Sequence, residues 1–287
     1  MKIIHNLNTV NFASVIGIFI SLSFTPKVIA GAWVPEVGSG YNNLAFSDFE
    51  ATDFFGSNDS FNKFKGQNTS LYVEQGVAKN LAITLNTLYQ EIEQIDNDDF
   101  RTSNTGFGDL EVGLRYNLVN GPFVLSTALT VKIPDLYDED DELPLGNGQE
   151  DYEARLLFGK SLNRFGYFGL ETGYRYRSSN PSDEIRYLLE YGFSATKNLY
   201  FRTKLDGIAS AGNADSTLDE ANPTTVTNLA VTPEFDIGKL ELTTGWQFNK
   251  AKNNSSQWGV EFTYTRDLYG SDTLQGDTYQ FGITRSY

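Results

Sequence analysis

The amino-acid sequence predicts an all-β protein, a transmembrane antiparallel up-and-down β-barrel of about 12 strands, with about 14 as the alternative. Three observations predict this fold. Apolar and polar residues alternate along most of the chain, which is the pattern of strands with two different faces. Several alternating segments reach ten residues, and a strand that crosses a bilayer needs about 9 to 11. Short turns are interleaved with long polar connections, as in outer-membrane barrels.

Composition agrees with this prediction. The chain has 287 residues and a formal net charge of -15, with 37 acidic against 22 basic residues. This balance disfavours nucleic-acid binding, which needs a basic surface. Hydrophobic residues make up 40% and aromatic residues 14%, too much for a disordered chain. The mean hydropathy of -0.35 excludes only helical membrane spans, because barrel strands average apolar and polar positions.

Residues 1–30 are predicted to be a signal peptide. A single lysine precedes the apolar run Phe12–Phe24, whose 13 residues fall short of the roughly 20 that a membrane-spanning helix needs. Cleavage is expected after Ala30 or Ala32, and an uncleaved anchor is the alternative. Residues 31–287 then form a single barrel domain, and the expected location is the outer membrane of a Gram-negative bacterial cell.

The clearest strand is predicted at 107–118. From Leu110 to Leu118 every second residue is apolar, and the residues between them are polar or glycine. The turn signal Asn120-Gly121-Pro122 follows, and the alternation then resumes. Residues 107–118 and 123–133 are therefore predicted to form a hairpin.

The same alternation predicts thirteen strands, and because bacterial single-chain barrels use even numbers, one of these predictions must be wrong. The first strand and the region 240–276 have the weakest pattern. Long polar connections are expected at 91–106, 134–150 and 207–224. The strands are expected at 41–50, 69–77, 81–90, 107–118, 123–133, 151–161, 165–177, 184–193, 199–206, 225–236, 240–249, 257–265 and 277–287.

The last predicted strand also has the features of a recognition signal for membrane insertion. Tyr279, Phe281 and Ile283 alternate with polar residues or glycine, and the chain ends on Tyr287. A final strand of this kind resembles the signal that the barrel-insertion machinery recognises. Arg285 departs from the pattern, because it lies on the face expected to meet lipid.

The polar faces of the strands are predicted to line the lumen. Antiparallel register across the short turns predicts pairs of opposite charge at the spacing of cross-strand neighbours. The pairs are Arg155 with Glu171, Asp151 with Arg175, Glu190 with Arg202, Arg186 with Asp206, and Asp109 with Lys132. These charge pairs either serve only to neutralise the buried polar wall of the barrel or line a selective passage. The lumen-lining candidates are Asp109, Glu111, Arg115, Lys132, Asp151, Glu153, Arg155, Glu171, Arg175, Arg186, Glu190, Arg202 and Asp206.

The expected outer connections carry two acidic clusters, one from Glu91 to Asp99 and one from Asp135 to Glu142. Carboxylate oxygens suit hard cations, and Asp138, Asp140 and Glu142 have the first spacings of a calcium loop. Leu143 holds the position that needs glycine, so the motif fails, and no metal site is expected. A solvated acidic loop is the simpler interpretation.

The chain is predicted not to be an enzyme and to need no cofactor. It contains no cysteine, and its one histidine, His5, lies in the predicted signal peptide. Thiolate nucleophiles, Ser-His hydrolysis and His or Cys metal sites are therefore unavailable to the exported chain.

Several stretches resemble a family of bacterial outer-membrane barrels named for the MetA pathway of phenol degradation, and related transporter-like barrels. Gly-Asp-Leu at the start of an alternating strand is the most specific of them. The stretches are Gly31-Ala32-Trp33, Leu71–Gly76, Gly106–Tyr116, Gly146–Gln149 before Asp151-Tyr152, Gly173–Tyr176, and Pro181 with Asp183-Glu184. The resemblance implies an outer-membrane barrel associated with aromatic-compound breakdown that helps small molecules cross the membrane.

The function expected from these observations is a channel or transporter for small solutes, with aromatic or hydrophobic molecules as the candidates. The alternative is a non-transporting barrel that serves as a surface scaffold, an adhesin or a partner in envelope or polysaccharide assembly. The expected partners are outer-membrane lipid and lipopolysaccharide, the barrel-insertion machinery through the C-terminal strand, and a small-molecule solute, with no nucleic acid.

Overall fold

A computed structural model describes residues 31–56, 61–134, 136–138, 140–215, 229–230, 232–248 and 256–287. The expected signal peptide, 1–30, lies outside these residues. The fold is all-β, as predicted. The elements are β1 (Gly40–Phe55), β2 (Lys63–Ala78), β3 (Leu81–Ile95), β4 (Arg101–Asn120), β5 (Val124–Ile133), β6 (Asp151–Ser161), the short 3₁₀ helix η1 (Asn163–Phe165), β7 (Tyr167–Arg177), β8 (Glu184–Ser194), β9 (Leu199–Ser210), β10 (Asp236–Gln247), β11 (Gln257–Ser271) and β12 (Thr273–Ser286).

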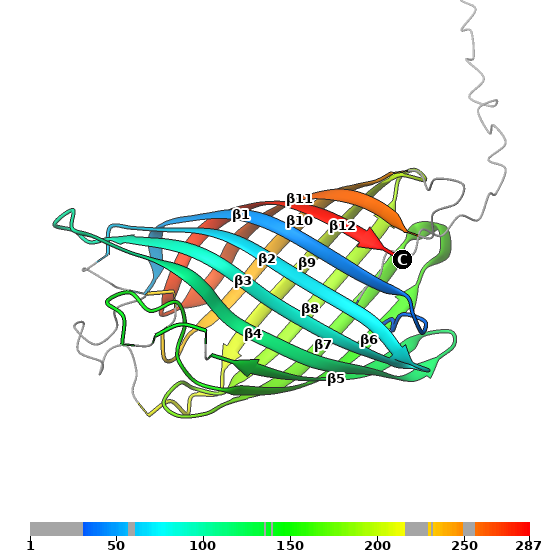
Figure 1. The fold of residues 1–287 in the computed structure, drawn as a ribbon, viewed down its shortest axis with the longest axis horizontal. Coiled ribbons are helices and arrows are strands. Elements are labelled where there is room, and N and C mark those ends of the chain that lie inside the picture. The colour runs from blue at the N-terminus through cyan, green and yellow to red at the C-terminus, as the bar shows by residue number, and fades with distance from the viewer. Residues whose placement is uncertain are drawn as a thin grey trace, which may run out of the picture.

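The twelve strands form one closed antiparallel barrel in which each strand pairs with its neighbours in sequence (Figure 1). β1 closes the sheet against β12, with register from Tyr41 opposite Ser286 to Phe55 opposite Thr273. The turns after β2, β4, β6 and β8 lie at the end of the barrel that holds the C-terminus, whereas β5 ends and β6 begins at the other end (Figure 1). We call these the turn end and the loop end. Among the described residues, no helix is long and apolar enough to cross a membrane.

The strand predicted at 225–236 is wrong. Its described part, 229–230 and 232–235, contains turns and bends, and β10 begins only at Asp236. Leu229 packs into an apolar cluster instead of alternating in the sheet. Pro233 has no N–H to give to a strand ladder, and its carbonyl accepts the backbone N–H of Ser182 at 2.8 Å. Removing this prediction leaves the even number of strands that a closed barrel of this class uses.

The long connection predicted at 91–106 is also wrong. β3 continues to Ile95 and β4 starts at Arg101, so that Glu91 and Glu93 belong to a strand. The Glu93 side chain has charged neighbours on the adjacent strands: Arg101 lies 3.4 Å and Lys65 lies 3.9 Å from its carboxylate. β1 to β4 have 15 to 20 residues, and the hairpin of β3 and β4 extends farthest at the loop end (Figure 1).

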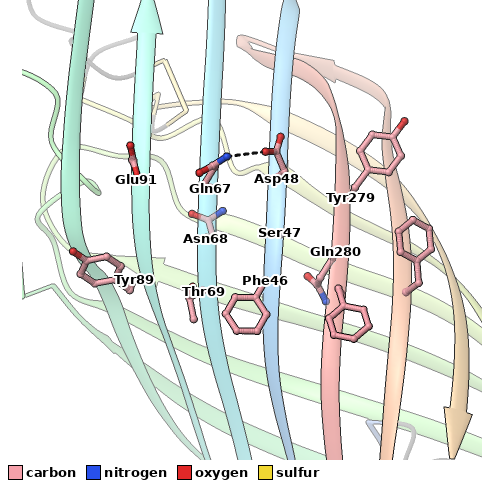
Figure 2. Close-up of a pocket in the computed structure, with 12 residues that line it drawn as sticks. Phe46, Ser47, Asp48, Gln67, Asn68, Thr69, Tyr89, Glu91, Tyr279 and Gln280 are labelled. Carbon is pink, nitrogen blue, oxygen red and sulfur yellow. Dashed lines mark hydrogen bonds between the residues drawn. The ribbon is translucent and has the colours of Figure 1, made fainter.

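The outward face is apolar along the middle of the strands and aromatic where it approaches the loop end. Leu114 is 48% exposed and Leu129 58% exposed, as lipid-facing side chains of an isolated barrel should be. Figure 2 shows Phe46 and Tyr89 on this surface, and beyond them the Asp48 carboxylate, which accepts a hydrogen bond from Gln67 Nε2 at 3.0 Å. The groove between these side chains is the boundary between an aromatic belt and a polar zone.

Glycine allows close packing between neighbouring strands. Gly245 lies opposite Tyr200 in the register of β9 and β10. A Cβ atom on Gly245 would lie 2.1 Å from the Tyr200 ring carbon Cζ, so only glycine fits beneath this ring. The ring position matters, because the Tyr200 hydroxyl donates a hydrogen bond to the buried Glu261 carboxylate.

Gly245→Ala is therefore expected to destabilise the barrel by about 1–3 kcal/mol, the usual cost of overpacking. The matched control is Gly66→Ala, because a Cβ atom on Gly66 would meet its nearest neighbour, a Phe64 ring carbon, at an ordinary 3.7 Å. The measurement is the temperature at which the fast-migrating folded band is lost on heating in detergent. Equal temperatures for the two variants would contradict the packing argument.

Candidate functional site

The inner wall carries a continuous chain of buried ion pairs. It starts at Lys132 on β5, whose Nζ lies 3.4 Å from Asp109 on β4 and 3.3 Å from Asp151 on β6. Lys132, at 4% exposed, and Asp151, at 3% exposed, are both removed from solvent. Ions in such a place are stable only when they are paired, which is why one lysine is shared by two carboxylates.

Arg175 on β7 is the centre of this chain. Its guanidinium lies 2.8 Å from Glu111, 2.7 Å from Glu153 and 3.6 Å from Asp151. A planar guanidinium with five donors can hold several carboxylates at once, which an ammonium group on lysine does less well. Arg155 continues the chain, since it pairs with Glu153 and lies 3.3 Å from Glu171.

Two further arginines extend the chain toward the loop end. Arg177 lies 3.7 Å from Asp151 and 3.2 Å from Glu184, and Arg186 lies 2.9 Å from Glu184. We call the whole chain the inner network. It joins six carboxylates to five cations, namely Asp109, Glu111, Asp151, Glu153, Glu171 and Glu184 with Lys132, Arg155, Arg175, Arg177 and Arg186.

A second cluster lies on β8 to β11. Lys204 is 3.9 Å from Glu190 and 3.6 Å from Glu241, and Arg202 is 3.3 Å from Glu261. The hydroxyl of Tyr167 donates a hydrogen bond to Glu190. A separate pair, Arg115 with Glu74, has its closest atoms 2.9 Å apart.

Some polar atoms of this wall have no hydrogen-bond partner within the described part of the chain. They include the Nε donors of Arg115, Arg186 and Arg202 and the side-chain oxygens of Asn43 and Asn68. The three arginines belong to β4, β8 and β9, whereas the two asparagines belong to β1 and β2. Donors on three strands and acceptors on two others are thus left for hydrogen bonds with water or a solute that reaches them.

A cluster of buried apolar side chains lies at the loop end. Leu143 is 1% exposed, and its carbonyl accepts a hydrogen bond from Asn104 Nδ2 at 2.9 Å. The Leu145 carbonyl accepts one from Gln90 Nε2 at 2.5 Å, so the backbone around Leu143 and Leu145 lies against the strands. We call this group the mouth cluster; it consists of Ala51, Phe61, Phe64, Ile92, Leu143, Leu145, Leu229 and Leu274.

The turn end is crossed by the segment that precedes β1. Ala32 is 2% exposed, and its carbonyl accepts a hydrogen bond from Ser126 Oγ at 2.5 Å. The Trp33 ring meets the Tyr167 ring edge-on, with centroids 5.9 Å apart. A Cβ atom on Gly159 would lie 2.5 Å from the Trp33 ring, so this glycine makes room for the indole. Residues 31–33 are therefore built into the wall.

Two titratable groups outside the strands hold the loop end together. Burial alone would raise the pKa of the Asp183 carboxyl, but hydrogen bonds from Tyr174 Oη at 2.5 Å, Arg177 N–H at 2.8 Å and Asn213 Nδ2 at 3.0 Å outweigh it, and the pKa is lowered. Burial, reinforced by the Asp109 carboxylate that the phenol bonds at 2.8 Å, raises the pKa of Tyr137. Asp183 is held ionised and Tyr137 neutral.

The cross-strand pairs predicted from the sequence are wrong in register by two residues. Arg155 lies opposite Gly173, Asp151 opposite Arg177, Glu190 opposite Lys204, Arg186 opposite Ile208, and Lys132 opposite Glu111. At β6 and β7 the cause is a longer turn, in which Asn163 and Gly166 take positive φ of 55° and 96°. A shift of two keeps each side chain on its face.

Because the face is kept, three of the five predicted pairs still form as diagonal contacts: Arg155 with Glu171, Asp151 with Arg175, and Asp109 with Lys132. The other two are replaced. Glu190 pairs with Lys204 and Arg202 with Glu261, while Arg186 pairs with Glu184. Asp206 lies opposite Lys239. That these side chains line a solute passage stays a prediction.

Sequence analysis missed several members of this wall. Glu74, Arg177, Glu184, Lys204 and Glu261 were not proposed, although each lies on the polar face of an alternating strand or at its end. That alternation was the signal that could have found them.

In the acidic loop, within the described residues, no group of three or more acidic or His side chains could hold a metal ion. Asp138 instead accepts the Asp140 backbone N–H at 3.0 Å.

Known structures share this architecture. No protein-family model and no curated protein matches the chain. The COG4313 outer membrane channel from Pseudomonas putida F1 matches with a TM-score of 0.68 and 13% identity, over 92% of this chain and 100% of that one. The NanC porin matches with a TM-score of 0.51 and 10% identity, over 84% and 98%. The chain has the fold of an outer-membrane channel barrel.

Arg175→Gln is expected to destabilise the barrel by about 3–5 kcal/mol, because it leaves Glu111 without its ion-pair partner and removes one of the cations that the buried Asp151 and Glu153 share. Arg101→Gln is the matched control: Arg101 pairs with Glu93 on the exposed outer face, where its side chain is 65% exposed, and such pairs contribute little. Thermal loss of the folded band measures both variants. A smaller loss for Arg175→Gln than for Arg101→Gln would show that the inner network is not stabilising.

Proposed function

We propose that this protein is an outer-membrane channel for small solutes. The observation that carries the proposal is the closed barrel with a polar, ion-paired inner wall and an apolar outer face. About 8 strands leave an interior filled by side chains and about 16 to 18 leave a wide aqueous channel. A barrel of this size favours a narrow passage, and its likeness to the COG4313 channel and the NanC porin supports the same class of function.

The loop end favours small aromatic or hydrophobic solutes. The mouth cluster offers an apolar surface of Phe61, Phe64 and Ile92 once Leu143 and Leu145 move away. An apolar molecule that binds here in place of these leucines gains the free energy of burying its own surface against the cluster. Deeper in, the unpaired donors of Arg115 and Arg202 can bind a polar group on the same molecule. An aromatic ring with one polar substituent fits both environments.

The inner wall favours cations among simple ions. Its described ion pairs join 11 carboxylates to 9 cationic side chains, an excess of two negative charges. A narrow polar passage with low-dielectric walls concentrates ions of the opposite sign. We therefore expect potassium to pass more easily than chloride.

Leu143→Ser combined with Leu145→Ser should raise single-channel conductance in planar bilayers several-fold, because an apolar constriction that stays dry resists the passage of ions. Leu136→Ser is the control, since Leu136 lies in the same connection and is 46% exposed. A salt gradient should give a reversal potential of the sign expected for cation preference. Absence of conductance from every one of these proteins would refute the channel proposal.

A further inference from the structure

The first described residue lies against an acidic side chain of the inner wall. A Cβ atom on Gly31 would lie 2.0 Å from Glu171 Oε1 and 3.4 Å from a Leu157 methyl carbon. With bonds of about 1.5 Å, this carboxylate oxygen is at most about 3.5 Å from the Gly31 Cα atom and about 5 Å from its nitrogen. Any side chain at Gly31 would collide with the carboxylate, so glycine lets the chain approach it closely.

Among the residues that the structure describes, Glu171 is one of the carboxylates of the inner network that share their only ion-pair cation with another carboxylate. Within the described residues its ion-pair partner is Arg155, at 3.3 Å, and Arg155 also pairs with Glu153. The inner network as a whole has six carboxylates for five cations. One further positive charge beside Glu171 would balance it.

The two residues before Trp33 are also required by the wall around them. Ser126 is 0% exposed, and its hydroxyl donates to the carbonyl of Ala32. Ala32 packs with Val124 and Leu157 in a small apolar cluster. A chain that began at Trp33 would lose this cluster and leave the buried Ser126 hydroxyl without its acceptor. Of the two cleavage positions expected from the sequence, the structure therefore favours the one that keeps Gly31 and Ala32.

We propose that the exported chain is cleaved between Ala30 and Gly31, and that the new α-ammonium group of Gly31 forms an ion pair with Glu171. Hydrolysis by a signal-removing peptidase breaks the peptide bond with one water. Ala30 keeps the new carboxylate, and the Gly31 nitrogen takes up a proton. The inner network then holds six carboxylates and six cations. This proposal rests on the positions of Gly31 and Ala32 against the wall and is independent of channel activity.

The intact mass of the full-length gene product, purified from outer membranes after export, tests the cleavage. The expected mass is that of residues 31–287. A chain that begins at Trp33, or at any residue other than Gly31, overturns the proposal.

Acetylation of the N-terminus by an active ester at neutral pH tests the ion pair. A free α-amine is normally labelled before lysines, because it loses its proton near pH of about 8 rather than about 10.4. In the folded wild-type barrel we expect labelling about tenfold slower than in the unfolded protein, the factor given by about 1.4 kcal/mol. Equal rates in the folded and unfolded protein would overturn the ion pair.

Two variants locate the effect. Glu171→Gln should bring the labelling rate of the folded protein back toward that of the unfolded one. Asp109→Asn, which removes a carboxylate from the other end of the inner network, should leave the wild-type rate unchanged. If Asp109→Asn raised the labelling rate and Glu171→Gln left it unchanged, the pairing of Gly31 with Glu171 would be overturned. The mass and the wild-type rates decide the proposal even where Glu171→Gln fails to fold.

Discussion

Closure of the sheet between β1 and β12 is the constraint on which the remaining features depend. A membrane offers no water to unpaired backbone groups, so a sheet within it must have no free edge. The register from Tyr41 opposite Ser286 to Phe55 opposite Thr273 removes that edge. Once the cylinder is closed, alternate residues of every strand must point inward. The polar face of each strand is then enclosed whether or not a solute ever passes.

Enclosure explains why cations on the inner wall are shared. Lys132 and Arg175 each contact more than one carboxylate, and Glu153 contacts both Arg155 and Arg175. A desolvated ion is costly when alone, and several partners of opposite sign offset that cost better than one. Each of the two shared cations thus contacts two or three carboxylates that come from two different strands.

The sequence predicted the faces of the strands better than their register. The alternation in 107–118 reflects which face of the strand meets an apolar environment. A shift of two residues in the pairing with the next strand leaves every side chain on the same face. Register depends on turn geometry, and the positive φ of Asn163 and Gly166 could not be read from composition. The strand at 225–236 failed for a different reason. Leu229 is buried by tertiary packing in the mouth cluster, and an apolar residue looks the same in sequence whichever way it is buried.

The two ends of the barrel are covered in different ways, by the apolar mouth cluster at the loop end and by the segment 31–33 at the turn end. Phe64 and Ile92 are strand residues that point an apolar surface into the barrel, which is unfavourable in water unless something covers them. Leu143 and Leu145 cover them, and uncovering would cost about 1.5–3 kcal/mol for each leucine. Water cannot recover that energy, but an apolar solute bound in their place can. In the proposed channel, opening would therefore depend on the hydrophobicity of the entering solute, whereas the segment 31–33 at the turn end is held by a buried hydrogen bond to the Ala32 carbonyl.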